Sequence, residues 1–227
     1  IGLIAESENY MPVINTLKNL LMKENLENLI KLQTINKDSF VVDCGAYKGD
    51  YTALIHHNFG CRILWLEPNP LYFKECEMRF AGNPDIMGIQ AALSGISKRS
   101  DLYLNEESSS LFKEWADSEE SIEVNELRAT DLIDFIRQNS FIEVNILKLN
   151  CEGAEYQIIK DLDFSDNLKN IDEILVQFHK LNKKFKKEPT IQFPNYQKEY
   201  KEVVEILNKT HDRTFKSKWE FWIKKPN

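Results

Sequence analysis

Apolar and polar positions follow two different patterns along this chain. Short runs of mainly apolar residues alternate with longer segments in which apolar residues recur at helical spacing. Such short runs are typical of strands buried on both faces of a parallel sheet, and the longer segments are typical of amphipathic helices. The predicted core strands span residues 40–44, 61–66, 86–92, 144–149 and 171–178, and the predicted helices span 49–58, 71–80, 131–138 and 196–207.

Strands that alternate with helices at this rhythm predict an α/β fold, with a mostly parallel sheet covered by helices on both faces. Two further strands are expected at 102–104 and 123–128, and Thr130 is expected to cap the helix that follows. Near the end of the chain, residues 213–215 and 219–223 alternate between apolar and polar. This alternation predicts an antiparallel hairpin at the edge of the sheet.

Two segments stand apart from this rhythm. Apolar residues recur at helical spacing over 10–33, so residues 1–38 are expected to form an N-terminal helical segment and residues 39–227 the main domain. Residues 105–121 are rich in Glu, Ser and Asp and show no clear period. Such a stretch is either a mobile lid or a segment without function, and the pattern leaves both interpretations open.

Charge is divided unevenly along the 227 residues. Residues 1–179 carry 16 Lys+Arg against 30 Asp+Glu, a net charge of −14, and residues 180–227 carry 13 against 6, or +7, which together give −7. This balance does not predict a nucleic-acid binder. The basic part is either a solvated surface or faces an acidic or phosphorylated substrate.

The cysteines and the apolar runs indicate the cellular compartment of the protein. The four cysteines, at positions 44, 61, 76 and 151, form no Cys-x-x-Cys pair and match no zinc spacing. We expect them to be buried thiols in a reducing compartment and predict no metal site. No signal segment is visible, and no apolar run approaches the ~20 residues that cross a bilayer. The chain is therefore expected to be cytoplasmic, without a membrane span.

A glycine turn follows the first predicted strand. Asp43 ends the apolar run, and Gly45 and Gly49 complete the pattern Asp-x-Gly-x-x-x-Gly before a helix. A strand, a glycine turn and a helix in succession bind nucleotide-like ligands at the carboxyl edge of a parallel sheet, where a Cβ would block the approach of the ligand. A pyrophosphate needs the tighter Gly-x-Gly-x-x-Gly. The looser turn suits a ligand without phosphate, such as S-adenosylmethionine.

An acidic residue follows the second predicted strand. Glu67 lies 22 residues after Gly45 and is followed by Pro68-Asn69-Pro70. An acid at this distance is placed to accept hydrogen bonds from both ribose hydroxyls, since a carboxylate accepts and does not donate. The prolines keep the turn out of a helix. The sequence therefore predicts an adenosine site formed by the ends of two strands.

Four blocks of the chain resemble the FkbM-type family of S-adenosylmethionine-dependent O-methyltransferases. They are residues 40–52, 66–70, 92–94 and 147–155, the last reading Leu-Lys-Leu-Asn-Cys-Glu-Gly-Ala-Glu. The resemblance covers about residues 40–180. It implies the Rossmann-like class I methyltransferase sheet, with seven strands and an antiparallel terminal strand.

The resemblance also implies roles for individual residues. The loop from Asp43 to Gly49 would border the methionine part of S-adenosyl-L-methionine, Glu67 would hold the ribose, and 92–94, expected as a loop, would lie along the adenine. S-adenosylhomocysteine would be the product. The cofactor-binding residues expected in this way are Asp43, Gly45, Ala46, Tyr47, Gly49, Thr52, Glu67, Pro68, Asn69, Ala92, Leu93 and Asn150.

Two positions depart from the family pattern. Family members usually have Asp where this chain has Asn150, and often Asn where it has Tyr47. Asn150 still forms hydrogen bonds, but it cannot act as a base or give a metal a charged oxygen.

A hydroxyl acceptor also needs a general base, and the candidates are Glu152, Glu155 and His179. Glu152 and Glu155 would share a helix face if the helix began at Cys151, although acids also favour helix N-termini for electrostatic reasons. His179 is either a neutral base or a structural residue. Five aromatic residues would form either a sugar-stacking wall or packing: Trp115, Phe193, Tyr196, Trp219 and Trp222.

The expected function is transfer of a methyl group from S-adenosylmethionine to a hydroxyl of a small molecule or glycan, with a sugar as the preferred acceptor. The residues leave two alternative functions open. One is an NAD-dependent oxidoreductase on a similar sheet, which the turn spacing and the lack of a Tyr-x-x-x-Lys pair after the fourth strand disfavour. The other is a non-catalytic cofactor-binding relative, for which Asn150 is the argument.

Overall fold

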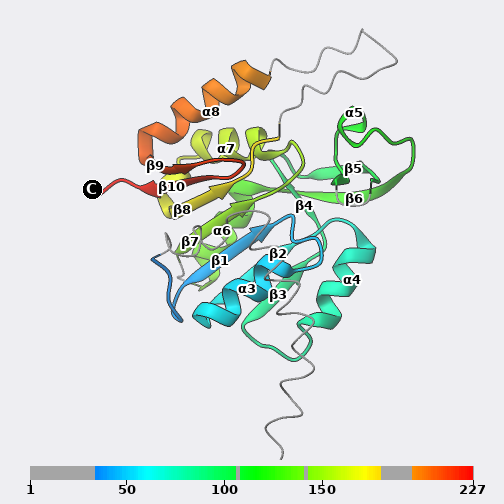
Figure 1. Cartoon of the computed structure of the whole chain (residues 1–227), viewed down its shortest axis with the longest axis horizontal. Helices are drawn as coiled ribbons and strands as arrows, with labels where there is room; N and C mark the ends of the chain where they lie inside the picture. Colours follow the sequence, from blue (N-terminus) through cyan, green and yellow to red (C-terminus); the bar gives the residue numbers. More distant parts are fainter. Residues whose placement is uncertain (1–33, 106–107, 141–142, 180–195, 227) are drawn as a thin grey trace, which may run out of the picture.

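The computed structural model describes residues 34–105, 108–140, 143–179 and 196–226. The predicted helices within 10–33 and the linker 180–195 lie outside the described residues. The described part is built on a seven-stranded sheet with strand order β3-β2-β1-β7-β8-β10-β9 (Figure 1). Its strands are β1 (Phe40–Cys44), β2 (Arg62–Leu66), β3 (Ile86–Ile89), β7 (Val144–Leu149), β8 (Ile171–Val176), β9 (His211–Lys216) and β10 (Glu220–Lys224).

The pairing of these strands confirms the predicted fold class. The ladders β3-β2-β1-β7-β8 are parallel throughout, and β10 runs antiparallel to both β8 and β9. The predicted terminal hairpin therefore inserts its second strand beside β8 and leaves β9 at the edge. Among the described helices, none is long and apolar enough to cross a membrane.

Alternate residues of β1 face two different layers of helices. Val41 packs against Ile55 of α3 (Asp50–Phe59), and Val42 belongs to the larger core that includes four other helices. The helices of that larger core are α5 (Lys113–Ala116), α6 (Ala129–Ser140), α7 (Glu155–Phe164) and α8 (Tyr196–Thr210). On the side of α3, Trp65 packs against α4 (Pro70–Arg79). The run 40–44 is apolar at successive positions because both faces of the strand are buried.

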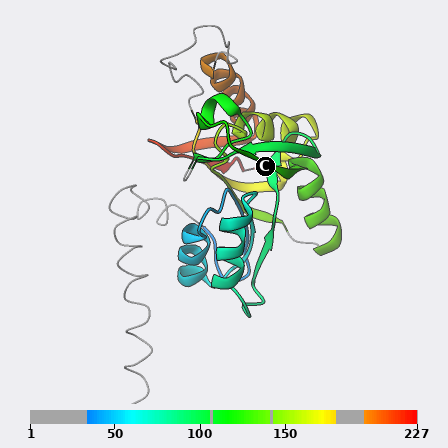
Figure 2. The same cartoon turned by 90° about the vertical axis from the view of Figure 1, so that its right-hand side faces the viewer.

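The predicted strand 86–92 is divided between two sheets. β3 ends at Ile89, and the main-chain N–H of Ala91 donates to the Ile89 carbonyl (3.0 Å), which closes a three-residue turn around Gln90. The chain then continues as β4 (Ala92–Ser94), so this segment is a strand and not the expected loop. The second sheet has the order β4-β6-β5, with β5 (Lys98–Tyr103) and β6 (Ser121–Arg128) (Figure 2).

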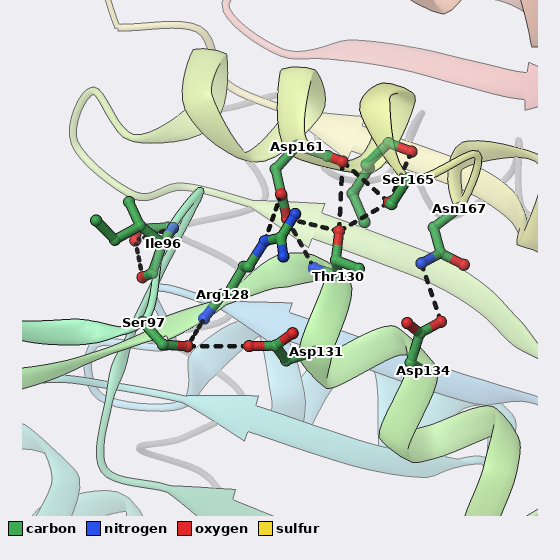
Figure 3. A network of polar contacts seen from close by, with 11 residues as sticks. Ile96, Ser97, Arg128, Thr130, Asp131, Asp134, Asp161, Ser165 and Asn167 are labelled. Carbon is green, nitrogen blue, oxygen red and sulfur yellow. Dashed lines mark hydrogen bonds and ion pairs between the residues drawn. The ribbon is translucent and has the colours of Figure 1, made fainter.

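A buried carboxylate joins this second sheet to the helices. Asp161 of α7 accepts hydrogen bonds from the Arg128 side chain (Nε, 2.7 Å) and from the main-chain N–H (2.9 Å) and hydroxyl (2.7 Å) of Thr130 (Figure 3). Helix α6 begins at Ala129, so Thr130 lies inside its first turn and does not cap it as predicted. Asp161 satisfies a main-chain donor of that turn from a neighbouring helix.

Candidate functional site

A narrow cleft lies where the strands β1, β2 and β7 end and β4 begins. Seven of the predicted cofactor residues line it: Gly45, Tyr47, Glu67, Pro68, Ala92, Leu93 and Asn150. Five do not line it: Asp43, Ala46, Gly49, Thr52 and Asn69. The remaining lining residues are Tyr72, Ala91, Leu102, Ser109, Ser110, Leu111, Cys151 and Glu152.

Asp43 and Thr52 lie beneath the glycine turn and support it. Asp43 is fully buried, and its two oxygens contact Lys148 Nζ (2.8 Å) and the Thr52 hydroxyl (2.7 Å). Lys148 also donates to the main-chain carbonyl of Gly45 (2.9 Å). Sequence reasoning gave Lys148 no role, although a lysine inside a buried strand run was a signal. The buried pair fixes the turn on which the cleft is built.

The glycines of the turn are required by protein neighbours. Gly45 has φ +75°, and a Cβ there would lie 2.0 Å from the Asn150 carbonyl oxygen. Gly49 has φ +76°, and a Cβ there would lie 2.6 Å from the ring of Phe80. The role of these glycines toward a ligand stays a prediction, and the contacts show that they also make room for the neighbouring strand end and for the end of α4.

Glu67 is held with its carboxylate at the cleft. Its oxygens accept hydrogen bonds from the main-chain N–H groups of Tyr47 (2.8 Å) and Asn69 (2.9 Å). Burial raises the pKa of Glu67 to about 7, although these two N–H groups act in the opposite direction. Each oxygen keeps a further lone pair, so the carboxylate retains the capacity to accept hydrogen bonds from a ligand.

Asn150 presents a buried oxygen without a partner. Its main-chain N–H donates to the Cys44 carbonyl (3.1 Å), which holds the residue against β1. Its side-chain Oδ1 is buried, and within the described part of the chain it accepts no hydrogen bond. A buried acceptor of this kind is costly unless a ligand or water satisfies it. Asn150 therefore offers an acceptor to a ligand in the cleft.

One side of the cleft is closed by the short segment 109–111, which we call the strap. The Ser110 hydroxyl donates to the main-chain carbonyl of Glu152 (2.7 Å), and Ser110 pairs with Tyr103 through two main-chain hydrogen bonds. With the strap in this position the cleft encloses about 70 Å³. Small-molecule sites commonly measure ~300–1,000 Å³, so the cleft in this conformation is smaller than a typical small-molecule site.

The three predicted catalytic residues meet at the end of β8. His179 Nδ1 lies 2.8 Å from Glu155 Oε1, and His179 Nε2 lies 3.2 Å from Glu152 Oε1. Helix α7 begins at Glu155, so the condition for a shared helix face is not met. Glu152 precedes the helix with φ +46°, a left-handed conformation that is strained for a residue with a side chain. The two glutamates approach the histidine from different directions.

Glu155 and Glu152 differ in what else they contact. Glu155 is fully buried and also accepts the main-chain N–H groups of Cys151 (2.8 Å) and Gly153 (3.0 Å), so its oxygens are occupied. Glu152 accepts the indole N–H of Trp115 (2.8 Å) and lines the cleft. Of the two glutamates, Glu152 therefore lines the cleft and Glu155 does not.

His179 is held as a cation. Burial lowers its pKa, but the carboxylates of Glu155 and Glu152 outweigh burial and raise it to about 10. Because both ring nitrogens are engaged and the ring is charged at neutral pH, His179 does not fit the predicted role of a neutral base.

A second cavity of about 830 Å³ opens on the other side of His179. Its lining comes from α5 (Lys113–Ala116), the end of β8, α8 and the β9–β10 turn. The residues are Trp115, Tyr156, Gln177, Phe178, His179, Tyr196, Gln197, Tyr200, Lys201, Lys216, Ser217, Lys218 and Glu220.

The predicted aromatic wall is only partly present. Trp115 and Tyr196 line this second cavity, whereas Trp219 and Trp222 are buried in the core. Phe193 lies outside the described residues. The two cavities share no lining residue, and Glu152 lies between them because it lines the first and contacts Trp115 and His179 of the second. Among the described residues, no group of three or more His, Cys, Asp or Glu side chains is arranged to hold a metal ion.

Comparisons with known proteins agree with this geometry. A family model described as the methyltransferase FkbM domain matches residues 43–217. A comparison with curated proteins found no match. Among solved structures, a putative rRNA methylase from Clostridium thermocellum is similar at a TM-score of 0.50 and 12% identity, over 89% of this chain and 95% of that one.

Two further similar structures were solved with S-adenosylhomocysteine. The TrmK protein of M. capricolum has a TM-score of 0.44 and 9% identity, over 88% of this chain and 66% of that one. The N-terminal domain of human METTL16 has a TM-score of 0.47 and 13% identity, over 91% and 70%. Identities this low concern the fold alone.

Proposed function

This chain belongs to the FkbM methyltransferase family, and we propose that it methylates a hydroxyl group of a small molecule or glycan, with a sugar as the preferred acceptor. It is an S-adenosylmethionine-dependent enzyme with S-adenosylhomocysteine as its product. The family match leaves no support for the alternatives of an NAD-dependent oxidoreductase or a non-catalytic relative.

The residues of the first cleft fit the cofactor. Glu67 offers carboxylate lone pairs for the two ribose hydroxyls, and the unpartnered Asn150 Oδ1 offers an acceptor for the amino group of the methionine part. When bound, S-adenosylmethionine supplies a methyl group on a positively charged sulfur. The cofactor enters by displacing the Ser110 strap, which forms hydrogen bonds with Glu152 and Tyr103.

The observation that carries the proposal is the position of Glu152 between the two cavities. An acceptor in the second cavity places its hydroxyl against this carboxylate. Glu152 would take the hydroxyl proton of the acceptor, to which the bound cofactor would supply its methyl group. His179 and Trp115 hold the Glu152 oxygens in place, and Glu155 fixes the His179 ring.

The test is a panel of hydroxylated acceptors incubated with S-adenosylmethionine labelled in the methyl group. In the Glu152→Gln variant, whose amide oxygen still accepts from Trp115, we expect turnover to fall about 10²–10⁴-fold, the usual contribution of a general base. Its affinity for S-adenosylhomocysteine, measured by isothermal titration, should be unchanged. Full turnover in this variant would remove the role of base from Glu152.

We also propose that the protein works in the cytoplasm. The four cysteines are free, and three of them are buried. Free thiols fit a reducing compartment. Localisation of a tagged full-length protein tests this proposal, and a periplasmic or extracellular signal would contradict it.

A further inference from the structure

The second cavity has an aromatic wall. The rings of Tyr156 and Phe178 lie 5.4 Å apart between centroids, and Phe178 and Tyr200 are also 5.4 Å apart. Phe178 and Tyr200 are half-buried, so parts of their rings remain open to the cavity. Pockets lined by aromatic side chains with a few polar groups suit small ligands that contain a ring.

The outer part of the cavity is basic. Three lysines line it, Lys201 from α8, Lys216 from the end of β9 and Lys218 from the β9–β10 turn, and all three are exposed. Within the described part of the chain, Lys201 forms no hydrogen bond or ion pair, so its charge is available to a ligand. Lysines of this kind act as compact point charges toward carboxylate and phosphate groups.

The one acidic side chain in this outer lining is already neutralised. Glu220 is buried, with Arg213 Nη1 3.3 Å from one oxygen and Lys216 Nζ 3.6 Å from the other. The Tyr200 hydroxyl also donates to Glu220. In the described outer lining, three lysines therefore stand against one carboxylate.

His179 and the lysines lie at different depths in the second cavity. His179, in contact with Glu152, is 7% exposed at the inner end of the cavity, whereas the lysines are open to solvent. A ligand that fills the cavity then has one end beside His179 and the proposed base Glu152, and the other end among the lysines. From this arrangement, and resting on the proposed function, we propose that the acceptor is a ring compound that carries an anionic group, a carboxylate or a phosphate. The anion binds Lys201 and Lys218, and the ring lies along Tyr156, Phe178 and Tyr200.

Three matched probes test this proposal: phenyl β-glucoside, phenyl β-glucuronide and phenyl β-glucoside 6-phosphate. They share both rings and differ only in the anionic group. Binding to the full chain in the presence of S-adenosylhomocysteine is measured by ligand-observed NMR. We expect the two anionic probes to bind about tenfold more tightly than the glucoside, the effect of roughly two partly exposed ion pairs. The stronger of the two identifies carboxylate or phosphate.

Variants locate the effect. In Lys201→Gln/Lys218→Gln the preference for the anionic probes should largely disappear, while the affinity for the glucoside and for S-adenosylhomocysteine stays the same. Lys209→Gln, on the same helix α8 but outside the cavity lining, is the matched control and should keep the preference. Equal affinities for the three probes, no binding of any probe, or an equal loss in the control would each overturn the proposal.

The outcome also separates this inference from the proposed function. Lysine-dependent binding of an anionic probe whose hydroxyls are never methylated would keep the anion site and reject methyl transfer to a hydroxyl. Methylation of the neutral glucoside with no preference for the anionic probes would keep the proposed function and reject the anionic acceptor.

Discussion

The two cavities on either side of Glu152 are built from different parts of the chain. The first is formed largely by main-chain turns that follow β1, β2 and β7, with a glycine packed against the Asn150 carbonyl and a buried Lys148–Asp43 pair beneath. The second is formed by side chains on α5, α8 and the β9–β10 turn. The first region tolerates little change, because its geometry is that of the backbone. The second can change one side chain at a time, which suits the part of an enzyme that selects the acceptor.

The largest effect should follow from Gly45→Ala. The added Cβ would lie 2.0 Å from the Asn150 carbonyl oxygen, in a conformation with φ +75° that disfavours side chains. We expect a loss of at least about 4 kcal/mol in the free energy of unfolding, or no folded protein. Denaturant unfolding measures it. Gly82→Ala, at φ +80° with no atom within 4 Å, is the control and should cost only about 1 kcal/mol.

A somewhat smaller loss should follow from Lys148→Met. The change leaves the fully buried Asp43 carboxylate without its 2.8 Å partner, and breaking a buried pair costs about 3–5 kcal/mol. Denaturant unfolding of the single variant and of Asp43→Asn/Lys148→Met tests the cause. The double variant should recover part of the loss. A double variant less stable than the single one would contradict the unpaired charge as the cause.

In the second region, His179 should make the free energy of unfolding depend on pH. The pKa of His179 is raised from 6.5 to about 10 in the folded protein. The protonated ring therefore adds stability that is complete below about pH 6.5 and is lost as the pH rises through about 10. Unfolding measured between pH 6 and pH 10 should show this loss, on the order of 4 kcal/mol. His179→Gln should flatten the profile, and an unchanged slope would contradict the ion pairs with Glu152 and Glu155.

The smallest effect concerns Glu67 and cofactor binding. Burial raises the pKa of this carboxyl to about 7, so it is increasingly protonated below pH 7. A protonated carboxyl is a poorer acceptor for ribose hydroxyls. Affinity for S-adenosylhomocysteine, measured by isothermal titration, should therefore fall by up to about tenfold for each pH unit below 7. Glu67→Gln should bind weakly and with a flatter pH profile. A wild-type affinity that is constant from pH 5 to pH 8 would contradict the binding of the ribose by Glu67.

The order of strands and helices was predictable because each element leaves a local apolar pattern. The first cleft was largely predictable for the same reason, since Gly45, Glu67 and Asn150 each follow a strand closely. The division of residues 86–92 between two sheets was not predictable, because an apolar run does not show with which sheet it pairs. The reason for Gly45 was also hidden, since its neighbour Asn150 lies far away in the sequence. The second cavity was mostly missed, because its lining extends from Trp115 to Glu220 without a common spacing.

The separate linings of the two cavities have a kinetic consequence. In the proposed reaction, donor and acceptor bind in separate cavities and approach each other at Glu152, so neither ligand has to pass through the binding site of the other. Either one can therefore be the first to load or the last to leave. Steady-state rates should then follow a random sequential scheme, in which S-adenosylhomocysteine competes with the donor alone.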